Sequence, residues 1–253
     1  MKKAIFLTVR TGSSRLHQKA LKKIMDVPTI VHLINRLKRS KYSDLIILCT
    51  STLEEDSILC DIAKENGIKS YAGSLKDKLD RWLKAALKYD VDYFVNVDGD
   101  DLFCEPELID LAFNQYEKEN HDFVVAKENE LVIGAFTLGV KTEALRNICA
   151  KKNTDDTEAA WLNFSKMEYF DSTFLQKIPN EYKRPDIRAT LDYQEDLMFF
   201  KKVINHFHGI NNPCYNLRDI IQFLDQNPDI IKINYHKNID YINNQKKMHQ
   251  TVY

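Results

Sequence analysis

This chain of 253 residues lacks paired cysteines, and that absence excludes two kinds of structural site. The five cysteines are far apart and none belongs to a C-x-x-C pair, so neither a disulfide framework nor a zinc site is indicated. His206 and His208 have no cysteine or carboxylate partners at ligand spacing, which favours surface histidines. We expect reduced and mostly buried thiols at Cys49, Cys60, Cys104, Cys149 and Cys214.

The sequence also lacks long apolar runs and an excess of either charge. No run approaches the roughly 18 residues of a membrane span, and the first apolar run is too short for a signal-peptide core. The 36 basic and 37 acidic residues leave a formal net charge of −1, which argues against a large nucleic-acid footprint. We therefore expect a soluble, cytoplasmic protein that binds neither membranes nor nucleic acids.

Two common phosphate-binding motifs, G-x-x-x-x-G-K-[ST] and G-x-G-x-x-G, are missing as well. The chain has instead a polar loop, residues 10–19, directly after the apolar run of residues 4–9, which indicates a buried strand ending at the loop. Small residues at 12–14 leave backbone N–H groups free for an anion. The loop also carries the positive charges of Arg10, Arg15 and Lys19, a combination that suits a triphosphate.

Strand and helix patterns alternate through the first half of the chain, which implies an α/β fold with a mostly parallel sheet and helices on both faces. Strands are predicted at residues 4–9, 45–49, 68–72 and 93–97, and helices at 28–37, 54–66, 77–89 and from Pro106. Later elements are one or two strands within 131–140, a helix at 155–166, a strand at 187–191, and helices at 193–207 and 216–224.

The chain shows no internal repeat and no linker. We therefore predict a single domain over residues 1–253, long enough for a substantial core. A small central insertion is expected at 127–182, and a polar tail at about 235–253.

An acidic turn, Asp98-Gly99-Asp100-Asp101, directly follows the predicted strand at 93–97. Ligands of open α/β sheets bind beyond the carboxyl ends of strands, so this turn and the 10–19 loop are expected at one edge. Asp192, at the end of the predicted strand 187–191, is placed to share a metal with Asp100. Two carboxylates plus substrate phosphates are typical of Mg²⁺ sites. The alternative for residues 98–101 is an ordinary acidic turn. Asp196, in the first turn of the helix that follows Asp192, is explained by the preference of helix N-termini for acidic side chains.

Together these segments resemble the cytidylyltransferases, the family that includes CMP-3-deoxy-manno-octulosonate synthetases, CMP-acylneuraminate synthetases and the spore-coat-polysaccharide type of enzyme. The most specific match is the opening R-x-x-S-x-R-L-x-x-K, present here as Arg10, Ser13, Arg15, Leu16 and Lys19. Further matches follow in order within residues 4–225, at Val27–His32, Tyr71–Ser74, Leu79–Arg81, Gly99-Asp100 and Thr190–Leu197.

The resemblance implies a nucleotide-diphospho-sugar transferase fold, a Rossmann-like α/β/α sandwich, that uses CTP and Mg²⁺. The implied reaction transfers CMP from CTP to an anionic sugar acid or a sugar or polyol phosphate, releasing pyrophosphate, for surface polysaccharide or glycoconjugate biosynthesis. Asp100 and Asp192 would carry the metal, and Arg15, Lys19 and Asp100 would be catalytic. The expected nucleotide-binding residues are Arg10, Thr11, Gly12, Ser13, Arg15, Lys19, Asp80, Arg81 and Asp98.

Several alternatives stay open. Asp80 and Arg81 also fit an exposed ion pair on a helix. His17-Gln18 stands where the family commonly has Pro-Gly, and residues 156–161 lack a histidine that the spore-coat branch often has. The sequence does not choose among sugar acids, phosphates and phosphonates as acceptor. The class is often homodimeric, with 127–182 as the expected acceptor and dimer surface. The rival functions are a metal-dependent glycosyltransferase of related fold using Asp98-x-Asp100, and an inactive nucleotide-binding protein.

Overall fold

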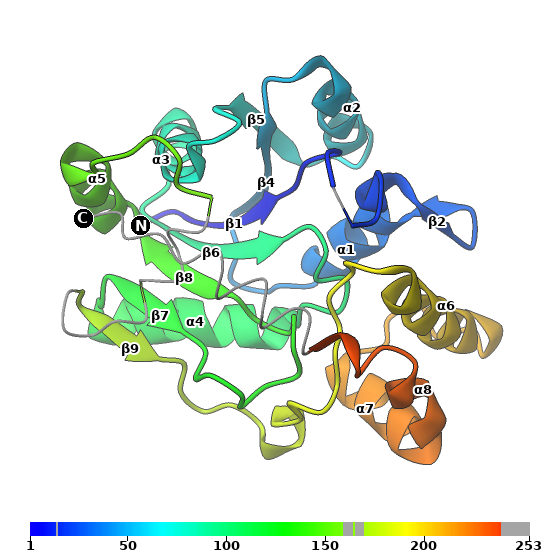
Figure 1. Ribbon diagram of the computed structural model, residues 1–253. Helices are drawn as coiled ribbons and strands as arrows, with labels where there is room; N and C mark the ends of the chain where they lie inside the picture. The colour runs from blue at the N-terminus through cyan, green and yellow to red at the C-terminus, as the bar shows by residue number, and fades with distance from the viewer. Residues whose placement is uncertain (14, 159–163, 165–169, 239–253) are drawn as a thin grey trace.

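The structure, a computed structural model, describes residues 1–13, 15–158, 164 and 170–238 (Figure 1). Its main sheet within these residues has the order β5-β4-β1-β6-β8-β7-β9. Among these strands only β8 runs antiparallel to its neighbours, so the prediction of a mostly parallel sheet is confirmed. The strands are β1 (Lys3–Thr8), β4 (Leu45–Ser51), β5 (Lys69–Gly73), β6 (Tyr93–Asp98), β7 (Phe123–Val125), β8 (Leu138–Lys141) and β9 (Ser172–Phe174), with a separate hairpin of β2 (Lys23–Ile24) and β3 (Val27–Pro28).

Helices cover both faces of this sheet, because successive side chains of a strand point to opposite sides. Ile5 and Leu7 of β1 belong to one apolar cluster with α1, α2, α4, α6 and α7, whereas Ala4 and Phe6 belong to another with α3 and α5. Figure 1 shows α3 and α5 on the opposite side of the sheet from α4. The helices are α1 (Thr29–Leu37), α2 (Ser57–Glu65), α3 (Lys78–Tyr89), α4 (Pro106–Glu119), α5 (Thr142–Lys151), α6 (Gln194–Gly209), α7 (Leu217–Gln226) and α8 (Pro228–Lys232). The predicted α/β/α sandwich is thus confirmed.

Local sequence signals determine where several helices begin. The Asp77 side chain accepts a hydrogen bond from the Asp80 N–H and caps α3. Pro106 is the first residue of α4, a position where its missing N–H costs no hydrogen bond. Asn216 and Asp219 form a capping box at the start of α7.

The predicted helix at 155–166 is wrong at its start, since residues 155–158 are not helical. The Thr157 N–H donates to the Lys76 carbonyl (3.0 Å), and the Thr157 hydroxyl accepts from the Leu79 N–H (3.0 Å). Residues 155–158 therefore pack on the beginning of α3. Residues 159–163 and 165–166 lie outside the described part of the chain, as do residues 239–253 of the predicted tail. The sequence pattern missed β7, α5 and β9.

The predicted strand at 187–191 is reduced to one bridge between Ile133 and Arg188. Within 131–140, only residues from Leu138 onward form a strand, because the chain turns at Gly134. Gly134 has a φ of +87°, and a Cβ there would lie 2.5 Å from the Ala189 carbonyl oxygen. The predicted helices at 193–207 and 216–224 are present as α6 and α7, and Pro228 starts α8 as well as following α7.

All five cysteines are free thiols, as predicted. Cys49 and Cys104 are buried, whereas Cys60 and Cys149 are half-buried and Cys214 is exposed, so the expectation of mostly buried thiols is only partly right. Burial raises the pKa of Cys49 to about 12, which keeps this thiol protonated at neutral pH. In the described residues, we find no helix with the length and apolar character needed to cross a membrane.

Candidate active site

The carboxyl ends of β1 and β6 meet at one edge of the sheet, because Thr8 is in register with Asp98. The polar loop leaves β1 at this edge and the acidic turn leaves β6. Gly99 permits their close approach: its N–H donates to the Thr8 carbonyl (2.8 Å), and a Cβ there would lie 2.6 Å from the Cβ of Val9. The two polar segments therefore lie side by side, as expected for strand ends of a parallel sheet.

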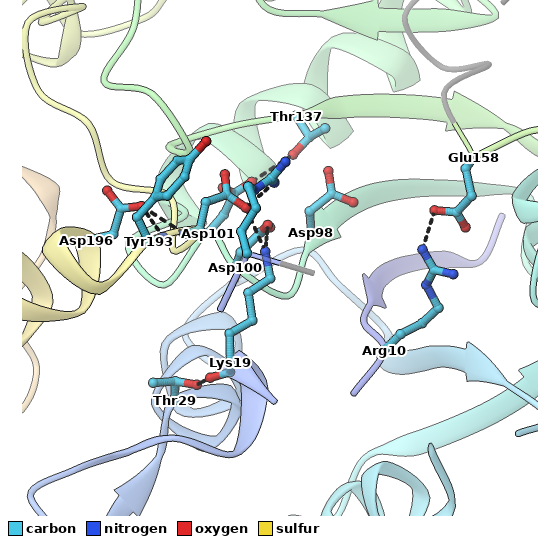
Figure 2. A network of polar contacts seen from close by, with 12 residues as sticks. Arg10, Lys19, Thr29, Asp98, Asp100, Asp101, Thr137, Glu158, Tyr193 and Asp196 are labelled. Atoms are coloured by element: carbon cyan, nitrogen blue, oxygen red, sulfur yellow. Dashed lines mark hydrogen bonds and ion pairs between the residues drawn. The ribbon is translucent and has the colours of Figure 1, made fainter. Parts of the chain in front are cut away.

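Lys19 connects the loop to both predicted metal-binding aspartates. Its Nζ lies 2.5 Å from Asp100 Oδ2 and 2.9 Å from Asp192 Oδ1, and Figure 2 shows the side chain extending from the loop toward Asp100. The Thr29 hydroxyl donates to the Lys19 carbonyl oxygen at 2.6 Å, which fixes the backbone at this point. The lysine ammonium thus marks a position where two carboxylates converge.

The side chain of Asp192 is only 2% exposed, and its two carboxylate oxygens have different partners. Oδ1 accepts from Lys19 Nζ and from Arg15 Nη2, the latter at 2.5 Å. Oδ2 accepts from Nη2 of the buried Arg188 at 3.1 Å. Arg188 therefore holds one oxygen from the protein interior and leaves the other facing the cations of the loop.

These contacts give the two aspartates opposite pKa shifts. Burial would raise the pKa of Asp192, but Lys19 and Arg15 outweigh burial and lower the pKa to about 2. Burial also raises the pKa of Asp100, and there the like charges of Asp192 and Asp98 add to it, so the attraction of Lys19 does not compensate. Asp100 is consequently the carboxylate of this pair that would benefit more from an additional cation.

The beginning of the loop is anchored through Thr11, which is 2% exposed. Its N–H and hydroxyl both donate to Asp56 Oδ1, at 2.7 and 2.6 Å, so its polar groups hold the loop in place. Gly12 is exposed and Ser13 is half-buried, and both leave the loop backbone sterically open. Residue 14 lies outside the described residues.

Gln18, in the position where the family commonly has glycine, adopts a left-handed backbone conformation with φ 48° and ψ 41°. This region is favourable for glycine and costs other residues free energy, because the Cβ approaches the following carbonyl. The chain therefore keeps a loop conformation suited to glycine without having one, and Lys19 still lies against both aspartates.

We predict that Gln18→Gly increases the free energy of unfolding by about 0.5–1 kcal/mol, because relief of left-handed strain exceeds the entropic cost of glycine. Urea unfolding of the purified protein measures the change. The same substitution at the exposed helical Gln222 should instead destabilise the protein by about 1 kcal/mol. A destabilised Gln18→Gly would show that the loop strain is absent.

Arg10 and Arg81 share a carboxylate that the sequence analysis did not assign. Arg10 Nη2 lies 3.0 Å from Glu158 Oε2, and Arg81 Nη2 lies 3.2 Å from Glu158 Oε1. Figure 2 shows the Arg10–Glu158 pair on the far side of Asp98 from Lys19. Arg81 is fully buried, so the exposed ion pair considered for it is not formed; Asp80 instead pairs with Lys84 at 2.9 Å.

Asp98 contacts Lys78, a second lysine that the sequence analysis missed. Lys78 Nζ lies 3.1 Å from Asp98 Oδ1 and 4.9 Å from the centroid of the Trp82 ring, with only 6% of its side chain exposed. Asn96 Nδ2 donates to the same Asp98 oxygen at 3.2 Å. Asp98 and Asp100 are therefore held by different lysines.

The residues at this edge fit a hard divalent cation such as Mg²⁺. The carboxylates of Asp100 and Asp192 already converge on one positively charged atom, Lys19 Nζ. Among the described residues, no group of three or more His, Cys, Asp or Glu side chains is arranged around a metal position. A protein that provides only two carboxylates suits Mg²⁺, which takes its remaining oxygen ligands from phosphates and water.

The missed residues differ in how visible they are in the sequence. Lys78 lies four residues before Trp82 on one face of a predicted helix, so a lysine on a tryptophan was foreseeable. Arg188 lies in a predicted strand that the structure reduces to one bridge, so strand alternation did not indicate which way its side chain points. Glu158 meets Arg10 across a separation of 148 residues, and only the folded chain shows that contact.

Comparison with known proteins identifies the family of this chain. The profile of the cytidylyltransferase family matches residues 4–246. An uncharacterised protein of Methanocaldococcus jannaschii is 34% identical over 231 residues, which cover 90% of this chain and 92% of that protein. The spore coat polysaccharide biosynthesis protein SpsF of Bacillus subtilis is 24% identical over 229 residues, covering 88% of this chain and 94% of SpsF.

Among solved structures, a cytidylyltransferase from Leptospira borgpetersenii has a TM-score of 0.81 and 25% identity, covering 91% of this chain and 97% of that one. The family match includes both Arg10 and Asp192, the two ends of the predicted site. The chain therefore belongs to the cytidylyltransferase family and is a nucleotidyltransferase.

Proposed function

We propose that this protein transfers CMP from CTP to an oxygen of an anionic sugar acid or of a sugar or polyol phosphate. The acceptor oxygen forms a bond to the α-phosphorus while the bond from that phosphorus to the β-phosphate oxygen breaks, so pyrophosphate leaves. A hydroxyl acceptor releases its proton to water. The observation that carries the proposal is that Lys19 contacts both Asp100 and Asp192, and Arg15 contacts Asp192, at the carboxyl edge of the sheet.

Nucleotidyl transfer depends on alignment and charge neutralisation more than on a protein nucleophile. In our proposal, Arg15 and Lys19 bind the triphosphate and stabilise the leaving pyrophosphate, with help from the backbone of Gly12 and Ser13. Their present aspartate contacts support this role, because each cation already lies against the proposed metal-binding carboxylates. Phosphate oxygens would replace part of those contacts when CTP binds.

The remaining predicted nucleotide-binding residues divide into two groups. Arg10 and Arg81, joined by Glu158, would lie farther along the nucleotide than Lys19, and Thr11 would act by holding the loop to Asp56. Asp98 would act through its pair with Lys78. For Asp80 the Lys84 contact offers no support for direct nucleotide binding.

Asp100 and Asp192 would hold Mg²⁺, which supplies positive charge to the phosphate oxygens when bound. Their convergence on Lys19 supports this assignment. The pKa of Asp100 is raised, first by burial and then by the like charges of Asp192 and Asp98, so a cation bound beside it would stabilise its ionised form.

SpsF is named for spore coat polysaccharide biosynthesis, which favours a role in surface polysaccharide or glycoconjugate synthesis.

We propose that the reaction occurs in the cytoplasm and that the active form is a homodimer, with 127–182 contributing to the acceptor and dimer surfaces. The edge strand β9 lies in that region, and Phe174 at its end is 41% exposed. Sedimentation of the purified protein tests the assembly.

A pyrophosphate-release screen tests the reaction. The four nucleoside triphosphates are each mixed with Mg²⁺ and a panel of sugar acids, sugar phosphates, polyol phosphates and phosphonates. We expect release with CTP and one acceptor class, and mass spectrometry should find the corresponding CMP-linked product. Reactions without acceptor and without Mg²⁺ are the controls.

Two other outcomes would contradict the proposal. Hydrolysis of a nucleotide sugar without pyrophosphate release would favour the glycosyltransferase alternative. Stabilisation by CTP in thermal unfolding, without turnover of any acceptor in the panel, would favour an inactive nucleotide-binding protein.

We further predict that Lys78→Met increases the KM for CTP about tenfold, the effect expected from losing one charge-assisted contact of about 1.4 kcal/mol. Methionine keeps the apolar stem against Trp82 and removes the charge beside Asp98. Steady-state kinetics at saturating acceptor measure KM. Lys84→Met on the exposed side of α3 is the matched control, and equal KM values for the two variants would exclude Lys78 from the nucleotide site.

A further inference from the structure

Asn234, far downstream of the predicted site residues, is completely buried. It follows α8, and the Lys237 ammonium near the same point lies 3.2 Å from Glu195 at the start of α6. Both N–H groups of the Asn234 amide reach the turn that carries Asp192. They donate to the Arg188 carbonyl oxygen at 3.0 Å and to Asp196 Oδ1 at 2.8 Å.

Asp196 in turn fixes the backbone of this turn. Its Oδ2 accepts from the N–H groups of Asp192 (2.8 Å) and Tyr193 (2.9 Å), and Arg188 Nε donates to its Oδ1 at 3.0 Å. Arg188 Nη2 then reaches Asp192 Oδ2 at 3.1 Å. Hydrogen bonds thus connect Asn234, through Asp196 and Arg188, to the carboxylate that faces Lys19 and Arg15.

Burying the amide of Asn234 reduces the stability of the fold unless its two N–H groups are needed as donors. Its Oδ1 atom is buried and has no hydrogen-bond partner among the described residues. An unpaired buried acceptor reduces stability, so an apolar side chain would be better tolerated if this position served packing alone. The chemistry of the position therefore points to the two donated hydrogen bonds.

From this network we infer that Asn234 is a positioning residue for Asp192. By fixing Asp196 and the Arg188 backbone, it holds Asp192 with one oxygen directed to Arg188 and the other to the cationic loop. This inference rests on the proposed function, because it requires Asp192 to act in nucleotidyl transfer. It assigns a role in the reaction to the segment that follows α8.

Asn234→Ala and Asn234→Asp test the inference. Alanine removes both N–H donors together with the amide, whereas aspartate keeps the size of the side chain and has acceptor oxygens in place of the donors. Loss of such an outer contact typically reduces metal affinity or activity about 10–100-fold. We expect kcat to decrease by that factor at saturating CTP, with the KM for CTP changed less than about threefold. We also expect weaker Mn²⁺ binding to the CTP complex without acceptor, measured from the free-Mn²⁺ EPR signal.

The matched control is Lys232→Ala, which removes an exposed ion pair with Asp229 from α8 and should leave kcat, KM and Mn²⁺ binding unchanged. Thermal unfolding reports the folded fraction of each variant, and rates are expressed per folded protein. If Asn234→Asp does not fold, the kcat and Mn²⁺ binding of Asn234→Ala test the inference. Normal kcat and Mn²⁺ binding with a lowered melting temperature would show a structural role only and overturn the inference.

Asp192→Asn, measured in parallel, separates this inference from the proposed function. If Asp192→Asn is inactive and the Asn234 variants are normal, the inference alone is wrong. If Asp192→Asn keeps wild-type turnover, the role of Asp192 is itself wrong, and the positioning role falls with it.

Discussion

Asp100→Asn is expected to reduce CTP turnover by about 10²–10³, the usual effect of removing one preorganised electrostatic group. The folded state should be unaffected or slightly more stable. Burial and the neighbouring charges of Asp192 and Asp98 raise the pKa of Asp100, so its ionised form is destabilised at neutral pH in the folded protein. A neutral amide removes that cost, and Lys19 keeps its contact with Asp192 at 2.9 Å.

Pyrophosphate release and thermal unfolding of the same preparation measure the two effects. Asp229→Asn, at a position whose side chain is 91% exposed, is the matched control and should match the wild type in both. Near-normal Mg²⁺-dependent turnover by Asp100→Asn would remove Asp100 from the metal site. A large loss of stability would instead show that the carboxylate serves the fold.

Arg188→Met is expected to destabilise the protein by about 3–5 kcal/mol, because removing one partner of a buried charge pair leaves uncompensated charge behind. Arg188 is fully buried, and its guanidinium contacts both Asp192 and Asp196, which are 2% and 0% exposed. Methionine roughly fills the space but offers no donor. Urea unfolding at pH 7 measures the effect. Arg218→Met, which breaks an exposed pair with Glu181, should cost less than about 1 kcal/mol.

The pH dependence of this destabilisation follows from the direction of the pKa shift of Asp192. In the native protein the pKa of Asp192 is lowered to about 2, so its stabilising contribution is present above about pH 4 and is lost as the pH falls toward 2. Without Arg188, Asp192 loses the hydrogen bond at its Oδ2, so the pKa of Asp192 is expected to be higher and this carboxyl to accept a proton at a higher pH. The stability difference between wild type and Arg188→Met should therefore shrink between pH 7 and pH 4. A constant difference would mean that lost packing, not charge, is responsible.

The first half of the fold could be predicted because local sequence patterns indicate its strands and helices. Short apolar runs indicated β1, β4, β5 and β6, and Pro106 indicated the start of α4. The second half was predicted less completely, since α6 and α7 were expected but β7, α5 and β9 were not. Residues 155–158 carry a helix-like acidic start, yet Thr157 bonds to Lys76 and Leu79. These hydrogen bonds join residues that are distant in sequence, and they override the local preference of residues 155–158 for a helix.

The site shows the same division. The charges at the sheet edge follow from the chain itself, because Arg10 to Lys19 lie just after β1 and Asp98 to Asp100 at the end of β6, and the parallel pairing of the two strands brings these ends together. How those charges are paired depends on the folded chain. Glu158 between Arg10 and Arg81, Lys78 on Asp98, and Asn234 behind Asp192 all join segments distant in sequence. Local patterns encode the backbone's preferences, whereas the partner of a buried charge depends on which segments the whole core brings together.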